Sequence, residues 1–250
     1  MMDVVRVAVV DHTNLDDRDV ERGVAALQQQ VREDFGPVWG VEVELTVVPK
    51  RCVRERHPGH WGLILLDDEK KGDDYEDPVL GYHDMTRDGL PLARVFVNRV
   101  PQGQDWTHVA SHELLEMLAD PDTNATVYDH PDALTALFYA REVCDPVGAY
   151  ENGYPRGGRH VSDFVFPTWF ERGASARSSE AVRFDECRRT RAPFEILPGG
   201  YIGVFDPSIS AWRVKGHDGE LDEPRELGTR LERRSTAGNR WRTSDMIWSP

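Results

Sequence analysis

One segment, residues 106–121, constrains the fold and the chemistry of this 250-residue chain more than any other. Apolar residues recur through it at helical spacing, which predicts a single buried helix that ends at Asp120 and Pro121. His112, Glu116 and Asp120 are four residues apart and therefore lie on one narrow face of this helix. Two acids at this spacing repel each other, and an acid near a helix C-terminus opposes the helix dipole. A bound cation would remove both penalties, so the helix is a candidate metal site.

The charge, the hydropathy and the cysteine content of the chain exclude several classes of protein. Lys and Arg number 30 against 44 Asp and Glu, for a net charge of −14, which argues against nucleic acid as a partner because phosphate contacts need a basic surface. No window is long enough for a membrane span, and the apolar run at residues 4–10 is too short for a signal peptide. Three cysteines without CxxC spacing indicate reduced thiols. We therefore expect a cytoplasmic protein that binds neither nucleic acid nor membrane.

The spacing of apolar residues predicts an α+β fold in which strands and helices form a layered N-terminal part. The expected strands are residues 4–10, 41–48, 62–66 and 93–100, and a helix is expected from residue 16 to residue 35, ending at Gly36 and Pro37. Further along, the chain is more irregular: we expect a polar surface loop at 174–191 and a turn into a strand at 193–204.

We divide the chain into three parts. Residues 1–121 form an N-terminal subdomain with the metal-site helix, and residues 122–227 form a lobe that supplies a third ligand and a cleft wall. Residues 228–250 are rich in Arg and poor in apolar side chains, which predicts a flexible tail. Within the lobe, the aromatic segment 163–170 would line the cleft, although core packing is the better interpretation for Phe164 and Phe166.

The sequence His112-Glu113-Leu-Leu-Glu116 is a variant of the His-Glu-x-x-His motif of zincin-type zinc peptidases, with Glu at the second ligand position. In that motif two ligands one turn apart hold the metal, and the Glu after the first ligand activates a water. A Glu oxygen is also a competent zinc ligand. We interpret His112 and Glu116 as ligands and Glu113 as the general base. The alternative for Glu113 is a buried carboxylate bonded to backbone amides.

A third ligand is available downstream in Glu142 or Asp145. The alternatives are a salt bridge from Glu142 to Arg141 and an Asx-turn at Asp145 before Pro146. We expect Asp120 to cap the helix or support the site rather than to bind the metal. Strand 93–100 directly precedes the helix, the position in which zincins carry the edge strand that pairs with an extended substrate.

The remaining potential ligands lack this kind of spacing. We expect His108 to be exposed at the helix start and Cys144 to be a small buried residue. The other histidines show no ligand spacing; they are His12, His57, His60, His83, His130, His160 and His217. The acid-rich run 67–77 could bind Ca²⁺, but it lacks EF-hand spacing, and a solvated loop explains it better.

Six segments of the chain, taken together and in their order along it, form a specific set of motifs. They are residues 111–121, 142–145 and 161–170, together with 4–10, 81–84 and 193–204. Over about residues 4–205, this set resembles a group of largely uncharacterised bacterial proteins. It is more distantly similar to secreted proteins with a Ser-His-Glu-Leu-x-Glu-x-x-x-Asp-Pro helix and to plant EXORDIUM-type proteins. The chain lacks the signal peptide and the Cys-rich pattern of the secreted relatives, which argues against extracellular proteolysis.

The resemblance implies a zincin-like fold with one Zn²⁺ on His112, Glu116 and, most simply, Glu142. It also implies a zinc-dependent hydrolase of the peptidase type, in which Glu113 serves a metal-activated water and the substrate is a peptide or protein. The alternative is a catalytically silent zincin-like protein with a structural metal or a ligand-binding role.

Overall fold

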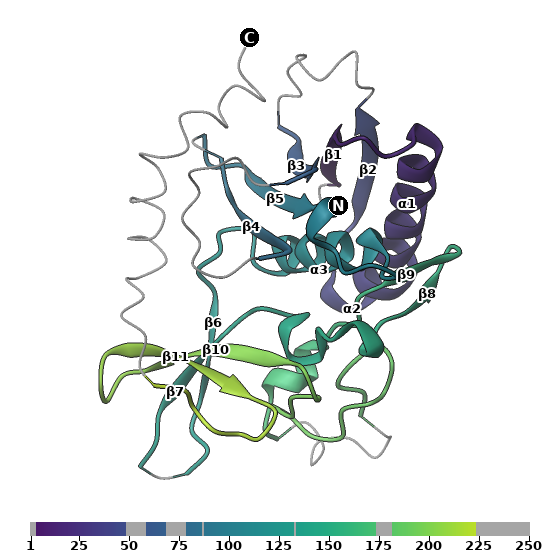
Figure 1. Cartoon of the computed structure of the whole chain (residues 1–250). Helices are drawn as coiled ribbons and strands as arrows, with labels where there is room; N and C mark the ends of the chain where they lie inside the picture. Colours follow the sequence, from purple (N-terminus) through teal and green to yellow (C-terminus); the bar gives the residue numbers. More distant parts are fainter. Residues whose placement is uncertain are drawn as a thin grey trace.

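The computed structural model describes residues 4–48, 59–68, 79–86, 88–132, 134–173 and 182–223, which form a mixed α and β protein, as the apolar pattern predicts (Figure 1). Residues 69–77 of the acid-rich run, Cys52 and the expected tail at 228–250 lie outside these residues. Within the described part of the chain, no helix is both long and apolar enough to cross a membrane.

The N-terminal part is built on a five-stranded sheet. In spatial order its strands are β2 (Val43–Val48), β1 (Val5–His12), β3 (Trp61–Leu66), β5 (Pro91–Phe96) and β4 (Gly81–Met85). Four of the strands run parallel, and β4 alone runs antiparallel, against β5. The central strands are apolar on both faces, as parallel strands that are covered on both sides require.

The strand that precedes the helix Trp106–Ala119 is not the edge strand. We expected strand 93–100 in that position, but β5 lies between β3 and β4, and β4 ends the sheet among the described strands. The apolar pattern also did not predict β4, because its residues are all only partly buried. A half-buried edge strand has neither a continuous apolar run nor a clear alternation.

Two helices cover one face of this sheet, α1 (Asp17–Gln30) and α3 (Trp106–Ala119) (Figure 1). Aspartates at their N-caps, Asp16 and Asp105, each accept a backbone N–H from the first turn. A π-helical turn, η1 (Val31–Phe35), and α2 (Gly36–Trp39) continue α1.

The expected end of the first helix at Gly36 and Pro37 is wrong by one turn. Pro37 lies in the first turn of α2, directly after the π-helical turn, a position at which proline is tolerated. The helix ends instead at Gly40, whose positive φ of 69° terminates it in the left-handed conformation.

The C-terminal lobe contains a four-stranded antiparallel sheet, which lies below α3 in Figure 1. In spatial order its strands are β11 (Ala211–Gly216), β10 (Tyr201–Asp206), β7 (Leu137–Ala140) and β6 (Thr126–Asp129). The turn into a strand expected at 193–204 is confirmed by β10. The lobe also contains a hairpin of β8 (Tyr154–Arg156) and β9 (Arg159–Val161).

Short 3-10 helices lie in the connections of both parts of the chain. They are η3 (Val97–Arg99), η4 (Asp145–Val147), η5 (Tyr150–Asn152) and η6 (Pro167–Phe170). Of these, η4 directly follows Cys144 and opens with Asp145, one of the candidate ligands.

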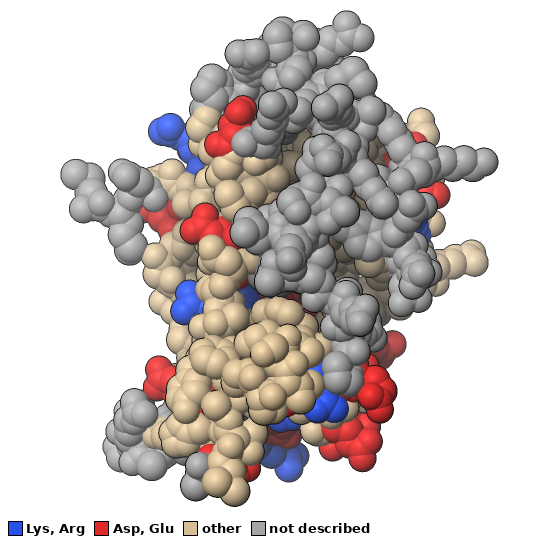
Figure 2. Space-filling model, turned by 90° about the vertical axis from the view of Figure 1, so that its left-hand side faces the viewer, with Lys and Arg blue, Asp and Glu red and all other residues tan. Residues whose placement is uncertain are grey.

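One hydrophobic core joins the two parts of the molecule. Phe164 and Phe166 are buried in it, as expected, and Phe164 meets Phe35 of η1 edge-on with ring centroids 5.1 Å apart. The surface loop expected at 174–191 is wrong where the structure describes it, because Phe184 and Asp185 are buried. On the face shown in Figure 2, Lys and Arg side chains lie interspersed with Asp and Glu.

Candidate metal centre

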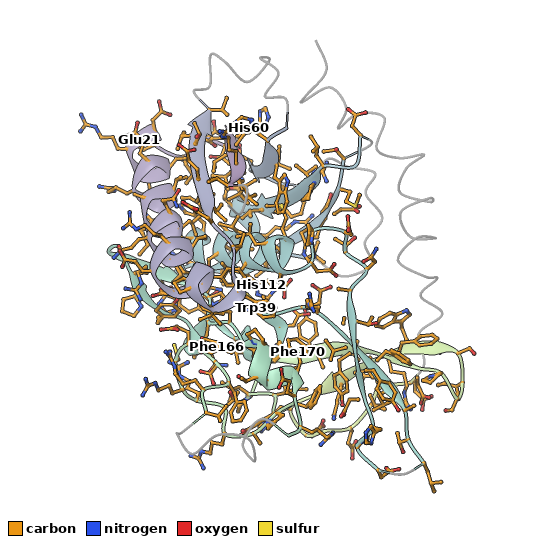
Figure 3. All side chains as sticks on the ribbon, turned by 180° about the vertical axis from the view of Figure 1, so that it is seen from behind. Glu21, Trp39, His60, His112, Phe166 and Phe170 are labelled. Carbon is orange, nitrogen blue, oxygen red and sulfur yellow. The ribbon has the colours of Figure 1, made fainter. Side chains whose placement is uncertain are left out.

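The helix α3 is buried along almost its whole length, and His112 is its least buried residue. Every other residue of α3 is buried, whereas the His112 side chain remains 16% exposed. Figure 3 shows His112 at the boundary between the helices and the C-terminal lobe, close to the end of the helix that carries Trp39. The helix therefore presents its one accessible polar side chain at the junction of the two parts.

One ring nitrogen of His112 lies close to the oxygen atoms of two carboxylates. Its Nε2 is 3.4 Å from Glu116 Oε2 and 3.2 Å from Asp145 Oδ1. In a tetrahedral zinc site with bonds of about 2.0–2.1 Å, neighbouring ligand atoms are about 3.3–3.4 Å apart. The two distances from His112 match this spacing, and the ligand atoms of His112, Glu116 and Asp145 all lie within 4.8 Å of one another.

The orientation of Glu116 is set by the backbone of the loop that carries Asp145. Its Oε1 accepts the N–H groups of Cys144 at 3.1 Å and of Asp145 at 3.2 Å. The other oxygen, Oε2, is the atom that faces the imidazoles. These bonds join α3 to the start of η4 and hold Asp145 against His112.

A second group includes the histidine that the sequence pattern did not identify. His83 of β4 places Nδ1 at 3.6 Å from Glu116 Oε2 and Nε2 at 3.5 Å from Glu142 Oε2. Glu142, the third ligand that the resemblance implies, therefore forms a group with His83 and Glu116, whereas Asp145, the alternative that the spacing left open, lies at His112.

The register of β4 explains why His83 faces the helix. Gly81 and His83 pair with Val95 and Ala93 of β5, which belong to the core on the helix side of the sheet. Tyr82 lies on the opposite face, where its hydroxyl accepts from Arg94 at 3.2 Å. Strand alternation could have found His83, but only once residues 81–85 had been recognised as a strand.

Glu113, the expected general base, is buried between α3 and β4. Its Oε2 is 3.7 Å from His83 Nδ1, and its side chain is 9% exposed. A Cβ atom added to Gly81 would lie 2.8 Å from Glu113 Cγ and 2.9 Å from its Oε1. The absence of a side chain at Gly81 is what leaves room for this carboxylate.

Asp120 supports the loop after the helix, as expected. It is the C-cap residue of α3, and its carboxylate accepts the backbone N–H groups of Asn124 at 3.1 Å and of Ala125 at 2.9 Å. His108 is buried, contrary to the expectation of an exposed residue, and its ring stacks on that of His160 with centroids 5.6 Å apart.

The charges of the cluster shift the pKa values of its members. Burial alone would lower the pKa of His112, but the Glu116 and Asp145 carboxylates outweigh it and raise that pKa well above its usual value. Burial and the nearby Glu116 raise the pKa of Asp145 to about 6. Burial opposes ionisation of Glu116 as well, yet His112 and His83 keep its pKa lowered.

Two other side chains border the group. Tyr201 is 48% exposed as a residue, but its phenol faces Asp145, and the Asp145 charge, together with burial of the phenol, raises the pKa of Tyr201. Cys144 is fully buried, as expected, and burial raises the pKa of its thiol well above the usual value. Cys144 belongs to neither group of potential ligand atoms, and both groups consist of imidazole nitrogens and carboxylate oxygens.

Comparisons of the chain with protein-family models, with curated proteins and with solved structures find no match.

Proposed function

We propose that this chain is a zinc-dependent hydrolase of the peptidase type on a zincin-like scaffold. The observation that carries the proposal is the meeting of His112 Nε2 with Glu116 Oε2 and Asp145 Oδ1, at 3.4 and 3.2 Å, beside the Glu113 carboxylate. Among the third ligands that the sequence left open, we propose Asp145 because of its distance to His112.

The residues present fit a zinc ion. One imidazole and two carboxylates match the donor types that zinc accepts, and three protein ligands are the usual number where a position stays available for chemistry. Backbone bonds to Glu116 and the phenol of Tyr201 on Asp145 hold these carboxylates in place, as supporting partners do around metal ligands. When bound, such an ion would polarise a water and a substrate carbonyl.

Glu113 is the proposed general base of the reaction. Its Oε2 lies 3.7 Å from His83 Nδ1, the atom that is also 3.6 Å from the proposed ligand Glu116, and it would take a proton from the attacking water. It would then donate that proton to the amine that leaves when the peptide C–N bond breaks. Burial beneath β4 shields this carboxylate from bulk water and confines the proton to the site.

The edge strand β4 supports an extended peptide as the substrate. It ends the sheet among the described strands, and it carries His83 directly beside the cluster. An extended chain can add to such an edge through backbone hydrogen bonds, which would bring a peptide bond close to Glu113.

Metal analysis is the first test. The purified chain should contain zinc, and the His112→Ala variant should lose it. His60→Ala is the matched control, because Figure 3 shows His60 far from His112. A chain that takes up no zinc when the metal is supplied would overturn the proposal.

The second test separates catalysis from metal binding. Glu113→Gln should keep the zinc content and lower the cleavage of a fluorogenic peptide library by about 10²–10⁴-fold, the usual contribution of a general base. Glu21→Gln on the exposed side of α1 is the matched control and should cleave as the wild type does (Figure 3). Equal cleavage by wild type and Glu113→Gln would show that Glu113 is not the base.

The burial of the cluster favours one alternative, a zincin-like protein in which the metal is structural. The side chains of Glu116 and Asp145 are only 5% and 9% exposed, and the group ties α3 to η4. A metal there would stabilise the fold by linkage without turnover. In that case Glu113→Gln would change neither activity nor metal content, and chelation would lower the thermal unfolding midpoint.

A further inference from the structure

The proposed zinc site leaves one buried imidazole unexplained. The His83 side chain is 7% exposed, and its Nε2 makes no hydrogen bond. Both ring nitrogens nevertheless point at carboxylates, Nε2 at Glu142 and Nδ1 at Glu113 and Glu116. A buried ring nitrogen without a hydrogen-bond partner is costly, and it needs a function or an unseen partner to explain it.

His83, Glu116 and Glu142 together make a second set of ligand atoms. One atom from each lies within 4.8 Å of the others, the same limit that the group of His112, Glu116 and Asp145 meets. The three residues come from β4, α3 and the segment after β7, so separate elements hold them. A divalent cation there would bind one ring nitrogen of His83, while the other nitrogen would keep the carboxylate that faces it, and the cation would relieve the repulsion between two buried carboxylates.

The two sets share a single residue, Glu116. Its Oε2 lies 3.4 Å from His112 Nε2 and 3.6 Å from His83 Nδ1, so this one oxygen is close to both imidazoles. In two-metal sites the ions are about 3.5–4 Å apart and carboxylates commonly bridge them. The closeness of Glu116 Oε2 to both histidines fits a bridging ligand.

We propose that the cluster binds two divalent cations of the first transition row. One is held by His112, Glu116 and Asp145, and the other by His83, Glu116 and Glu142, with Glu116 shared between them. The inference rests on the proposed function for the first ion alone. It assigns Glu142 to a metal, as the resemblance implies, but places it on a different ion from His112.

The stoichiometry of metal binding tests this proposal without measuring activity. The metal-free full-length chain is titrated with Zn²⁺ by calorimetry, and its content is checked by elemental analysis after gel filtration. We expect two equivalents for the wild type, one for His83→Ala and one for Glu142→Gln. Glu142→Gln keeps the size of the side chain, so it serves if His83→Ala does not fold. His60→Ala should retain two equivalents.

Loading the chain with Mn²⁺ adds a spectroscopic test of the bridge. Two Mn²⁺ ions that share a carboxylate oxygen are exchange-coupled, so the EPR spectrum of the doubly loaded protein should differ from the six-line spectrum of an isolated ion. His83→Ala should restore the six-line spectrum. Two ions without coupling would overturn the shared role of Glu116.

The outcomes separate this proposal from the proposed function. One equivalent of zinc in the wild type, with peptide cleavage intact, would overturn the second site and leave the hydrolase proposal standing. Two equivalents without cleavage would support the second site and count against the hydrolase. No bound metal at all would overturn both.

Discussion

Gly81 of β4 and Glu113 of α3 lie so close together that a Cβ atom on Gly81 would be 2.8 Å from Glu113 Cγ. This approach holds the edge strand against the helix at the point where the proposed base lies. The carbonyl oxygen of Arg94 on β5 lies at the same 2.8 Å from that Cβ position, so the strand cannot move aside toward β5. Position 81 therefore requires glycine, because there is no space for a side chain between α3 and β5.

The Gly81→Ala substitution should therefore displace Glu113 and lower peptide cleavage, with a loss of stability of about 1–3 kcal/mol from overpacking. Cleavage rates and urea unfolding would measure the two effects. Gly203→Ala on β10 is the control, because a Cβ there would find its nearest neighbours at 3.6 Å or more, an ordinary contact distance. Equal cleavage by Gly81→Ala and wild type would mean that the position of Glu113 does not matter.

Zinc affinity should rise with pH. The pKa of His112 is raised well above its usual value, so at neutral pH the imidazole holds a proton that zinc must displace. Near pH 7 we expect release of about one proton per zinc, and hence an affinity that rises about tenfold per pH unit. Below the Asp145 pKa of about 6, a second proton must leave, and the dependence should steepen.

Calorimetry in buffers of different ionisation enthalpy counts these protons directly. The metal-free protein should show the opposite trend: His112 stabilises it below the unfolded pKa, and this contribution is lost as the pH rises through the raised folded value. An affinity that is flat between pH 5 and 8 would contradict the assignment of His112 as a ligand.

Tyr201→Phe should weaken zinc binding by about tenfold while the protein stays folded, because the variant removes the phenol that faces Asp145 and leaves the ring in place. Competition with a chromophoric chelator would measure the change. Tyr128→Phe on β6 should have no effect, because Tyr128 is similarly exposed (54% against 48% for Tyr201) but does not face Asp145. If the affinities of the Tyr201 and Tyr128 variants are the same, Tyr201 does not support the site.

Arg159 of β9 joins the two main helices. It donates to Asp19 of α1 and to Asp105, the N-cap of α3, each at 2.6 Å in its shortest contact. Although burial opposes ionisation of Asp19, Arg159 lowers its pKa to about 2, and the pKa of Asp105 is lowered in the same way. These pairs stabilise the fold above the unfolded pKa of Asp and lose that effect as the pH falls toward 2.

Arg159→Met should accordingly cost about 1–3 kcal/mol of unfolding free energy at pH 7 and less at pH 3, as measured by urea unfolding. Arg22→Met is the control: Arg22 pairs with the same Asp19 at 3.3 Å, but its side chain is 69% exposed. An exposed pair of this kind is worth about 0–1 kcal/mol. A loss that is equal at both pH values would argue that packing, rather than charge, explains the effect of Arg159.

The sequence by itself determined the elements whose burial pattern is strong. The helix α3, the parallel strands β1 and β3 and the core position of Phe164 follow from apolar spacing, since each lies against a single large core. The sequence pattern did not predict the strand β4, whose residues are all partly buried. It also failed at Phe184, an apolar residue hidden in a polar stretch that the core covers.

The residues of the candidate site fall into the same two classes, those that the sequence predicts and those that only the structure brings together. His112, Glu113 and Glu116 could be read from the sequence because they lie within two turns of one helix, where spacing fixes mutual position. Only the tertiary structure decided which carboxylate meets His112 and brought in His83. Asp145 and Glu142 are three residues apart, and the turn between them directs one to His112 and the other to His83. A contact between distant segments depends on how their backbones are packed, and the local spacing of residues does not predict that packing.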